Sequence, residues 1–339
     1  MVAWKIVTFA QIMDIILPNK ISLIDEESFD HYALETFRYQ AENNEVYKKY
    51  LKLLHVDLHS IKKIDQIPFL PIQFFKSHKV LSSKDTVQQI FLSSGTTGMD
   101  QSKHYVTDIQ LYENSYLDGF QYFYGNIDDY IILALLPNYL ERNGSSLVYM
   151  VDDLIKKSKS KESGFYLNNL KELSKKLTEL DQKNKKILLI GVSYALLDLI
   201  EFKKFHLKNT IIMETGGMKG RRKEMVKEEL HQLLCEGFGV NKIHSEYGMT
   251  ELLSQAYSVG DGIFKTPPWM KILTRDTEDA LTILPQNRTG GINVIDLANF
   301  NSCSFIATQD LGKIHKNGTF EILGRFDNSD IRGCNLMVV

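Results

Sequence analysis

The sequence predicts an α/β fold in which mostly parallel sheets are flanked by helices and are followed by a β-rich subdomain. Between about Gln88 and Thr266, short apolar runs alternate with amphipathic stretches of helical period, the pattern of a parallel sheet covered on both faces. After Thr266 the helical periods stop, and short apolar runs separated by turn signals remain. A chain of 339 residues is long enough for one large or two moderate domains.

Residues 1–88 are expected to form a helical region packed on the core. From residue 26 to residue 54, aromatic and aliphatic residues recur at three- and four-residue steps, which indicates amphipathic helix. Pro68 and Pro71 then bracket an irregular connection.

Residues 89–265 are expected to form an α/β nucleotide-binding core. Apolar runs predict strands at 130–136, 185–190 and 210–213. Helical periods predict helices at 107–124, 168–180, 194–205 and 221–236. In such sheets the ligand binds in loops that follow the carboxyl ends of the strands. Unusual loops follow the apolar runs that end at Leu92 and Met213 and the segment Lys242-Ile243-His244.

Residues 266–326 are expected to form the β-rich subdomain. Apolar runs predict short strands at 281–284, 292–297 and 305–308. Asn317-Gly318, just before Phe320-Glu321-Ile322, is a strong hairpin signal. Residues 327–339 are too few for a domain, and we interpret them as a hinge and a short C-terminal arm.

Composition excludes several classes of function. The 42 acidic and 40 basic residues nearly cancel, so no global charge attracts nucleic acid or anionic membrane. The three cysteines, Cys235, Cys303 and Cys334, are widely spaced and form no Cys-x-x-Cys pair, which argues against a disulfide framework or structural zinc. A reducing, cytoplasmic location fits best.

The apolar N-terminus does not indicate a membrane segment. Lys5 and Asp14 interrupt residues 1–18, and the stretch lacks the features of a signal peptide. No apolar run reaches the about 18 residues that span a bilayer. We therefore expect an amphipathic segment packed on the domain and no membrane span.

The loop Ser93-Ser94-Gly95-Thr96-Thr97-Gly98 is the sharpest local signal. Its two glycines permit close backbone conformations, and its hydroxyls and amides can surround phosphate oxygens. It lacks the Gly-Lys-Ser/Thr ending of the common P-loop, which disfavours that class of NTPase. An ordinary polar turn is the alternative interpretation.

Two further signals follow along the chain. In Tyr247-Gly248-Met249-Thr250-Glu251, an aromatic ring can stack on a purine, and the neighbouring hydroxyl and carboxylate can bind phosphate and Mg²⁺. Asp310, followed by Gly324-Arg325, offers a carboxylate that can accept both ribose hydroxyls and an arginine that can add donors. Taken alone, the Tyr247 run is as consistent with an ordinary strand-end turn as with a binding site. Asp310 and Arg325, taken alone, are consistent with charges that flank a hairpin.

The order of these motifs resembles that of adenylate-forming enzymes, the superfamily of acyl-CoA synthetases, adenylation domains and luciferases. The resemblance is to their large N-terminal domain and implies activation of a carboxylic acid with ATP. It implies that Ser93, Ser94, Gly95, Thr96, Thr97 and Gly98 hold the ATP phosphates. It further implies that Gly216 and Gly217 line the adenine and that Tyr247 stacks on it. Thr250 and Glu251 would lie near phosphate and Mg²⁺, with Glu251 as the metal ligand. Asp310 and Arg325 would bind the ribose.

Two departures from that superfamily point to a narrower family. The glycine loop continues as Met99-Asp100-Gln101-Ser102-Lys103 where most relatives have Pro-Lys, and the chain stops at Val339, before the small domain that carries a catalytic lysine in relatives. Nearly end to end, the chain is similar to the LuxE-type acyl-protein synthetases of bacterial bioluminescence. That similarity includes the segment from Ile67 to Lys76, Pro267-Pro268-Trp269 and Gly333-Cys334.

The narrower resemblance implies that a fatty acyl group is joined to Cys334 as a thioester and passed to a partner acyl reductase. Arg332 supports this chemically: in an extended strand, residues two apart share a face, so its charge would favour the thiolate of Cys334. A small residue buried in a terminal strand is the alternative for Cys334.

Three other functions are weighed against this one. A ligase of the phenylacetate–CoA branch would transfer the adenylate to coenzyme A instead. Gly191-Val192-Ser193-Tyr194-Ala195 is almost the nucleophile elbow of an α/β-hydrolase-type acyltransferase, although alanine replaces its last glycine. A scaffold that binds nucleotide without turnover is the third.

Overall fold

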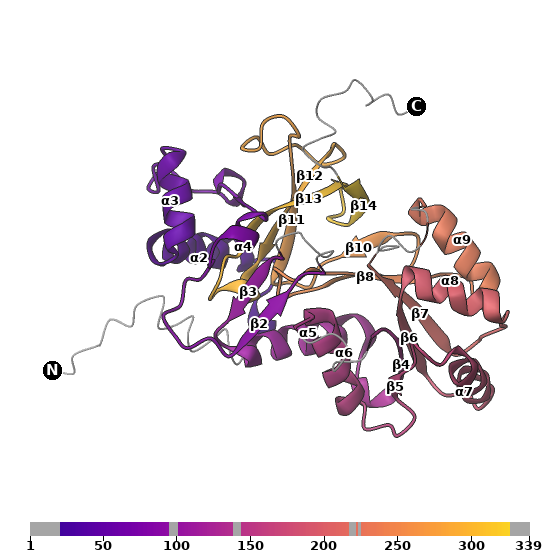
Figure 1. The fold of residues 1–339 in the computed structure, drawn as a ribbon. Coiled ribbons are helices and arrows are strands. Elements are labelled where there is room, and N and C mark those ends of the chain that lie inside the picture. The colour runs from indigo at the N-terminus through magenta and orange to yellow at the C-terminus, as the bar shows by residue number, and fades with distance from the viewer. Residues whose placement is uncertain (1–20, 95–100, 138–143, 217–221, 223–224, 326–339) are drawn as a thin grey trace.

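The computed structural model describes residues 21–94, 101–137, 144–216, 222 and 225–325 (Figure 1). Its helices are α2 (Phe29–Asn43), α3 (Glu45–Leu53), α4 (Phe74–Ser77), α5 (Ile109–Tyr124), α6 (Ser146–Lys157), α7 (Leu170–Gln182), α8 (Ser193–Phe202) and α9 (Lys227–Phe238). Single 3₁₀ turns are η1 (Ile21–Leu23), η2 (Ile64–Gln66), η3 (Ile127–Asp129) and η4 (Leu297–Asn299).

One large mixed sheet and one small hairpin contain all the described strands. The strands are β1 (Leu70–Pro71), β2 (Gln89–Leu92), β3 (Lys103–Val106), β4 (Ile131–Leu135), β5 (Gly164–Phe165), β6 (Ile187–Val192), β7 (Thr210–Thr215), β8 (His244–Tyr247), β9 (Ala256–Ser258), β10 (Ile263–Lys265), β11 (Met270–Arg275), β12 (Thr289–Asp296), β13 (Phe305–Ile314) and β14 (Phe320–Arg325). The large sheet has 12 strands in the order β11-β12-β13-β14-β10-β9-β8-β7-β6-β4-β5, with β1 pairing β13 from the side.

The half of this sheet from β5 to β8 is parallel, as the sequence predicts. β4 and β6 are uninterrupted apolar runs, and every residue in both is buried. Strands buried on both faces read this way because helices cover each side. Figure 1 shows α5 and α6 on one side of these strands and α7, α8 and α9 on the other.

The other half of the sheet is antiparallel and continues without a break from β8. The strongest hairpin signal forms as predicted: Asn317-Gly318 connects β13 to β14, and Gly318 takes a positive φ of 79°. The strand expected at 281–284 is reduced to a single bridge between Arg275 and Ile283. The domain boundaries expected from the sequence remain predictions.

The hairpin β2–β3 differs from the sequence expectation. The run that ends at Leu92 resembles the parallel strands locally, yet β2 pairs only with β3, antiparallel and outside the large sheet. A loop that leaves Leu92 and returns at Lys103 is short enough to bring the two strands back together directly. The glycine loop thus belongs to the chain segment that connects two paired antiparallel strands, β2 and β3.

The N-terminal helical region contains two helices, because Asn44 ends one and begins the next. Its side-chain oxygen accepts hydrogen bonds from the backbone N–H groups of Val46 and Tyr47, the arrangement of a helix N-cap. Its amide nitrogen donates to the carbonyl oxygen of Ser302 at 2.9 Å. Gln40 donates to the carbonyl of Phe300 at 2.7 Å, so both helices are attached to the turn before β13.

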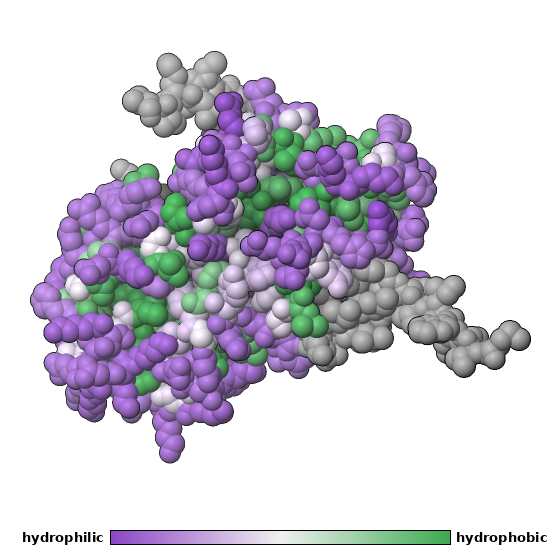
Figure 2. Space-filling view, turned by 180° about the vertical axis from the view of Figure 1, so that it is seen from behind, coloured by the Kyte–Doolittle hydropathy of each residue, from purple (hydrophilic) through white to green (hydrophobic). Residues whose placement is uncertain are grey.

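Seen from behind, the surface is mainly hydrophilic, with hydrophobic residues showing in small groups (Figure 2). Among the described residues, no helix combines the length and the apolar character needed to cross a bilayer.

Candidate functional site

Three residues from separate motifs, on β8, β13 and β14, lie together on the large sheet. The phenolic hydroxyl of Tyr247, at the end of β8, donates to Oδ2 of Asp310 on β13 at 2.8 Å. Nε of Arg325, at the end of β14, lies 3.4 Å from the other carboxylate oxygen of Asp310. Strand register explains the second contact, because Asp310 and Arg325 are directly opposed in the β13–β14 pair.

Burial controls the protonation of this group. The Asp310 carboxyl is buried, which raises its pKa, while the Tyr247 hydrogen bond and the charges of Arg325 and Arg275 partly oppose the rise. Burial also raises the pKa of the Tyr247 phenol, and the adjacent Asp310 charge adds to that effect. Tyr247 is therefore a neutral hydrogen-bond donor to the carboxylate.

Thr250 and Glu251 lie directly after β8 and are fixed by a buried histidine and a buried asparagine. Nδ1 of His104, on β3, lies 2.8 Å from the Thr250 carbonyl oxygen. Nε2 of the same ring lies 2.9 Å from Oδ1 of Asn299, whose amide nitrogen donates to the Glu251 carbonyl at 2.7 Å. These contacts attach the hairpin that carries the glycine loop to the Thr250–Glu251 segment.

The Glu251 carboxyl is buried, and burial raises its pKa. A hydrogen bond from Ser102 and the positive charges of Arg325 and Lys76 act in the opposite direction. Arg325 thus influences both Glu251 and Asp310, so the two carboxyl groups belong to one electrostatic cluster.

At the base of the glycine loop, the hairpin is closed by Ser93. Its backbone N–H donates to the Ser102 carbonyl at 3.1 Å, and its hydroxyl oxygen accepts from the Ser102 N–H at 2.9 Å. Ser94 is exposed. The other predicted loop residues, Gly95, Thr96, Thr97 and Gly98, lie outside the described residues, as do Gly217, Arg332 and Cys334.

Gly216 follows β7 at the same end of the sheet as Tyr247, because Thr215 is paired with Glu246 in the parallel β7–β8 ladder. Gly216 has a φ of 65°, a conformation that favours glycine. Its carbonyl oxygen accepts a 2.6 Å hydrogen bond from the hydroxyl of Ser193. The predicted adenine-lining position therefore lies beside the Tyr247 cluster.

An ion pair between a partly exposed lysine and a buried glutamate supports this turn, and the sequence did not predict it. Nζ of Lys227, at the start of α9, lies 2.9 Å from Oε1 of Glu214, and His231 lies 3.5 Å from the same oxygen. Burial alone would raise the pKa of Glu214. The His231 hydrogen bond and the Lys227 charge, helped by Ser245, outweigh burial and bring it to about 2. Neither partner lies near Glu214 in sequence, so no local signal could have revealed the pair.

The same contacts argue against the α/β-hydrolase alternative. Ser193 is buried, and its hydroxyl donates to Gly216 and, at 3.2 Å, to Glu214. A triad serine donates to a histidine that is oriented by the acid. Among the described residues, the Ser193 hydroxyl instead contacts the acid, Glu214, directly. No histidine is therefore placed to accept the serine proton as in a triad.

The two described cysteines fit structural positions. Cys303 is buried, and burial raises the pKa of its thiol to about 12. Cys235, on α9, is half-buried, and burial raises its pKa as well. Both thiols therefore resist ionisation at neutral pH.

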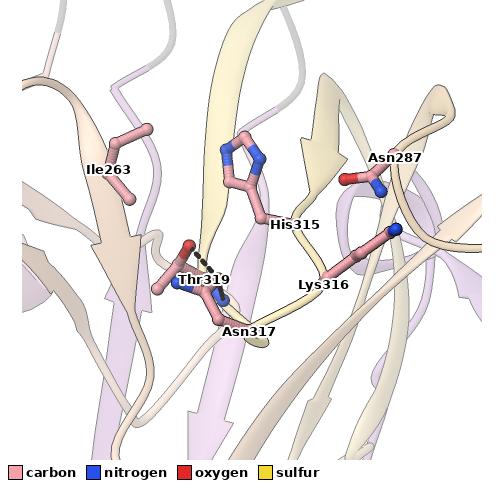
Figure 3. A pocket seen from close by; sticks show the side chains of 6 residues that line it. All are labelled: Ile263, Asn287, His315, Lys316, Asn317 and Thr319. Atoms are coloured by element: carbon pink, nitrogen blue, oxygen red, sulfur yellow. Dashed lines mark hydrogen bonds between the residues drawn. The ribbon is translucent and has the colours of Figure 1, made fainter.

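An open pocket lies away from this cluster, at the β13–β14 turn (Figure 3). Its lining residues are Ile263, Asn287, His315, Lys316, Asn317 and Thr319. The Thr319 hydroxyl donates to Asn317 at 2.7 Å, a contact within the turn itself. Because Arg325 stands at the opposite end of β14, this pocket is separate from the predicted nucleotide residues.

The donor set around Glu251 fits only one mode of metal binding. No group of three or more His, Cys, Asp or Glu side chains suited to a metal occurs in the described part of the chain. Mg²⁺ is commonly held by one or two carboxylates together with substrate phosphates and waters. A single buried carboxyl, Glu251, beside the Thr250 segment is compatible with that mode.

Comparisons with known proteins identify a matching family and solved structures of similar fold. A family model described as "Acyl-protein synthetase, LuxE" matches residues 4–339. None of the curated proteins matches the chain.

Solved structures share the fold at low identity. The ATP-bound MatB of Rhodopseudomonas palustris is 19% identical with a TM-score of 0.54, over 72% of this chain and 49% of MatB. The chain thus spans about half the length of MatB. An open conformation of 2-hydroxyisobutyryl-CoA ligase, in complex with 2-HIB-AMP and CoA, is 10% identical with a TM-score of 0.65, over 89% of this chain and 70% of the ligase. These likenesses confirm the predicted fold, that of the N-terminal domain of adenylate-forming enzymes.

Proposed function

The chain belongs to the LuxE family of acyl-protein synthetases, and from that premise we propose that it activates a fatty acid with ATP and then carries the acyl group on its own Cys334. The first step forms an acyl-adenylate. The second forms a protein thioester for delivery to a partner, for which we propose an acyl reductase. Family membership supports the acyl-activation step, and the cysteine step rests on the resemblance of Gly333-Cys334 to the end of LuxE-type chains.

The contact between Tyr247 and Asp310 carries the proposal for the nucleotide site. It joins two motifs 63 residues apart, and Arg325 adds a third at 3.4 Å. A carboxylate with two oxygens has about four acceptor positions. The phenol takes one position on Oδ2 and Arg325 lies against Oδ1, so the remaining positions are those that we assign to ribose hydroxyls. We therefore assign Asp310 and Arg325 to the ribose, and Tyr247 and Gly216 to the adenine side.

In the adenylation step, a carboxylate oxygen of the acid attacks the α-phosphorus of ATP and pyrophosphate leaves. The buried Glu251 carboxyl is the residue that would hold Mg²⁺, which supplies positive charge to the phosphate oxygens when bound. Thr250 is assigned to phosphate. We assign Ser93, Ser94 and the loop they begin to the same phosphates, because hydroxyl and backbone N–H groups can donate to their oxygens.

In the transfer step, the thiolate of Cys334 attacks the acyl carbonyl carbon. The bond to the phosphate oxygen of AMP breaks, AMP leaves, and a thioester remains. Arg332 would favour the thiolate through its charge. The high thiol pKa of the buried Cys303 disfavours that residue as the acyl carrier.

Exchange between ATP and labelled pyrophosphate tests the first step. We expect exchange that depends on a fatty acid, with Asp310→Ala strongly reduced. Absence of acid-dependent exchange across a panel of chain lengths and aromatic acids would reject the adenylate and favour a nucleotide-binding scaffold.

Transfer of a labelled fatty acid onto the protein tests the second step. Label that resists denaturation but is released by hydroxylamine should form on the wild type and on Cys235→Ser, but not on Cys334→Ser. If Cys334→Ser instead produces acyl-CoA from coenzyme A at the wild-type rate, the chain is an acid–CoA ligase.

A further inference from the structure

The strand that carries Asp310 is bulged at that residue. Between two regularly paired positions of β12 and β13, a single residue of β12, Ile292, stands opposite three residues of β13. The three are Thr308, Gln309 and Asp310. A regular antiparallel pair sets one residue against one, so β13 carries extra chain here. Bulges occur often next to active sites, where they change the direction of a side chain.

The buried side chain of Thr308 closes the bulge from within. Its hydroxyl accepts a hydrogen bond from the backbone N–H of Asp310 at 3.1 Å. The same hydroxyl donates to the carbonyl oxygen of Ile292 at 2.9 Å. Thr308 therefore connects the backbone of Asp310 to β12, and it fixes the point from which the Asp310 carboxylate projects.

Arg275, at the end of β11, reinforces the bulge from the other side of β12. One guanidinium nitrogen donates to the carbonyl of Ile292 and to Oδ1 of Asn293, both at 2.8 Å. The other donates to the carbonyl of Thr308 at 2.6 Å. A buried guanidinium is costly unless its donors are satisfied, and here they bridge β12 and β13 at the bulge.

Gly291 leaves the space that this guanidinium occupies. A Cβ atom at Gly291 would lie 2.7 Å from Cζ of Arg275 and 2.9 Å from both terminal nitrogens. Any larger residue there would displace the guanidinium from the two carbonyls. Three neighbouring strands thus each supply one part of the arrangement around Asp310: β11 the cation, β12 the space and β13 the bulge.

We propose that Thr308 and Arg275 are positioning residues, which hold the β13 bulge so that the Asp310 carboxylate faces the ribose hydroxyls of ATP. Both residues act through Asp310 and not on the nucleotide itself. Tyr247 and Arg325 contact the carboxylate group, whereas Thr308 and Arg275 fix the backbone behind it. This inference rests on the proposed ATP-dependent function.

Calorimetric titration of ATP and of its 2′,3′-dideoxy analogue into the full-length protein tests the positioning role. The analogue lacks both hydroxyls assigned to Asp310 and otherwise matches ATP. Thr308→Val should weaken ATP binding about tenfold and leave binding of the analogue nearly unchanged. Thr308→Ser, which keeps the hydroxyl, should restore most of the ATP affinity. Arg275→Lys should show the same selective loss, because an ammonium group lacks the planar fork that reaches several acceptors.

The matched control is Thr274→Val, on β11 beside Arg275. Thr274 is also buried, but its hydroxyl has no hydrogen-bond partner among the residues that the structure describes. This variant should keep the wild-type affinity for both nucleotides. Because ATP and the analogue are titrated into the same preparation, the ratio of the two affinities does not depend on the fraction of protein that is folded.

The outcomes separate this inference from the function on which it rests. Unchanged ATP affinity in Thr308→Val or in Arg275→Lys would overturn the role of that residue. An equal loss for ATP and the analogue would also overturn it, because the damage would then be general. A wild type that binds the two nucleotides equally would overturn the assignment of Asp310 to the ribose. A wild type that binds neither would overturn the proposed function together with this inference.

Discussion

The ring of His104 and the carbonyl of Thr250 are 2.8 Å apart, and this contact connects the glycine-loop hairpin to the end of β8. A carbonyl oxygen only accepts, so Nδ1 must carry the hydrogen. The Asn299 amide nitrogen already donates to Glu251 and Cys303, so its oxygen faces Nε2 of His104 and also needs a donor. The hydrogen bonds to Thr250 and Asn299 can therefore form together only when the His104 ring carries a proton on both nitrogens.

Burial nevertheless opposes that proton. It lowers the pKa of His104 to about 4 from 6.5, although the bonds to Thr250 and Asn299 act to raise it. The unfolded chain therefore binds more protons between pH 6.5 and about 4, so the free energy of unfolding falls as the pH falls through that window. We expect a loss of about 3 kcal/mol from this residue, measured as the pH dependence of Tm.

The variant His104→Gln isolates this effect. Its amide does not titrate, so its stability should decline less steeply toward acid pH than that of the wild type. The exposed His59→Gln should keep the wild-type slope. An unchanged slope in His104→Gln would show that another group, such as the buried His244, is responsible for the acid sensitivity.

Tyr247→Phe keeps the ring and removes the hydrogen bond to Asp310. The free energy of unfolding should fall by about 1 kcal/mol, because the carboxylate loses one donor. ATP affinity should fall by about tenfold if the bond orients Asp310 for the ribose. Calorimetric titration measures the affinity, with the exposed Tyr122→Phe as control. Unchanged ATP affinity would contradict an orienting role for the phenol.

Lys227→Met removes the lysine from the buried Glu214 and leaves His231 beside the carboxylate. Removing one partner of a fully buried ion pair typically costs about 3–5 kcal/mol. Because the Lys227 side chain is 27% exposed and His231 remains, we expect a smaller loss here. Urea denaturation should show that loss, and the double variant Lys227→Met/Glu214→Gln should recover part of it. A double variant less stable than the single one would mean that Glu214 does not depend on Lys227 for its stability.

Asp296→Ala should be strongly destabilising for a different reason. The buried carboxylate accepts from the backbone N–H groups of Leu253, Ser254 and Ala298 and from the Ser254 hydroxyl. Leaving several buried donors unpaired should cost about 3 kcal/mol or more. Asp296→Asn, which keeps one acceptor oxygen, should lose less. Tm measurements check the order, and the exposed Asp65→Ala should change little.

Local patterns were sufficient to predict most elements. The continuous apolar runs became β4 and β6, and Asn317-Gly318 formed its hairpin, because periodicity and turn chemistry act over a few residues. The partner of β2 could not be predicted this way, since a short apolar run does not show which strand it will pair with. β1 was missed because a two-residue strand has no period of its own. β1 pairs with Ile306 and Ala307 of β13, whereas β14 pairs with β13 only from Asp310 to Ile314, so the two strands use different parts of β13.

The sequence by itself determined the kinds of elements, the order of the motifs and the side chains available for chemistry, because these depend on neighbours along the chain. Only the tertiary structure decided that Tyr247 meets Asp310, that His104 meets Thr250 and that Lys227 meets Glu214. Such contacts follow from the order and register of strands in the sheet. They are set by burial of the whole core, which no local stretch of sequence contains.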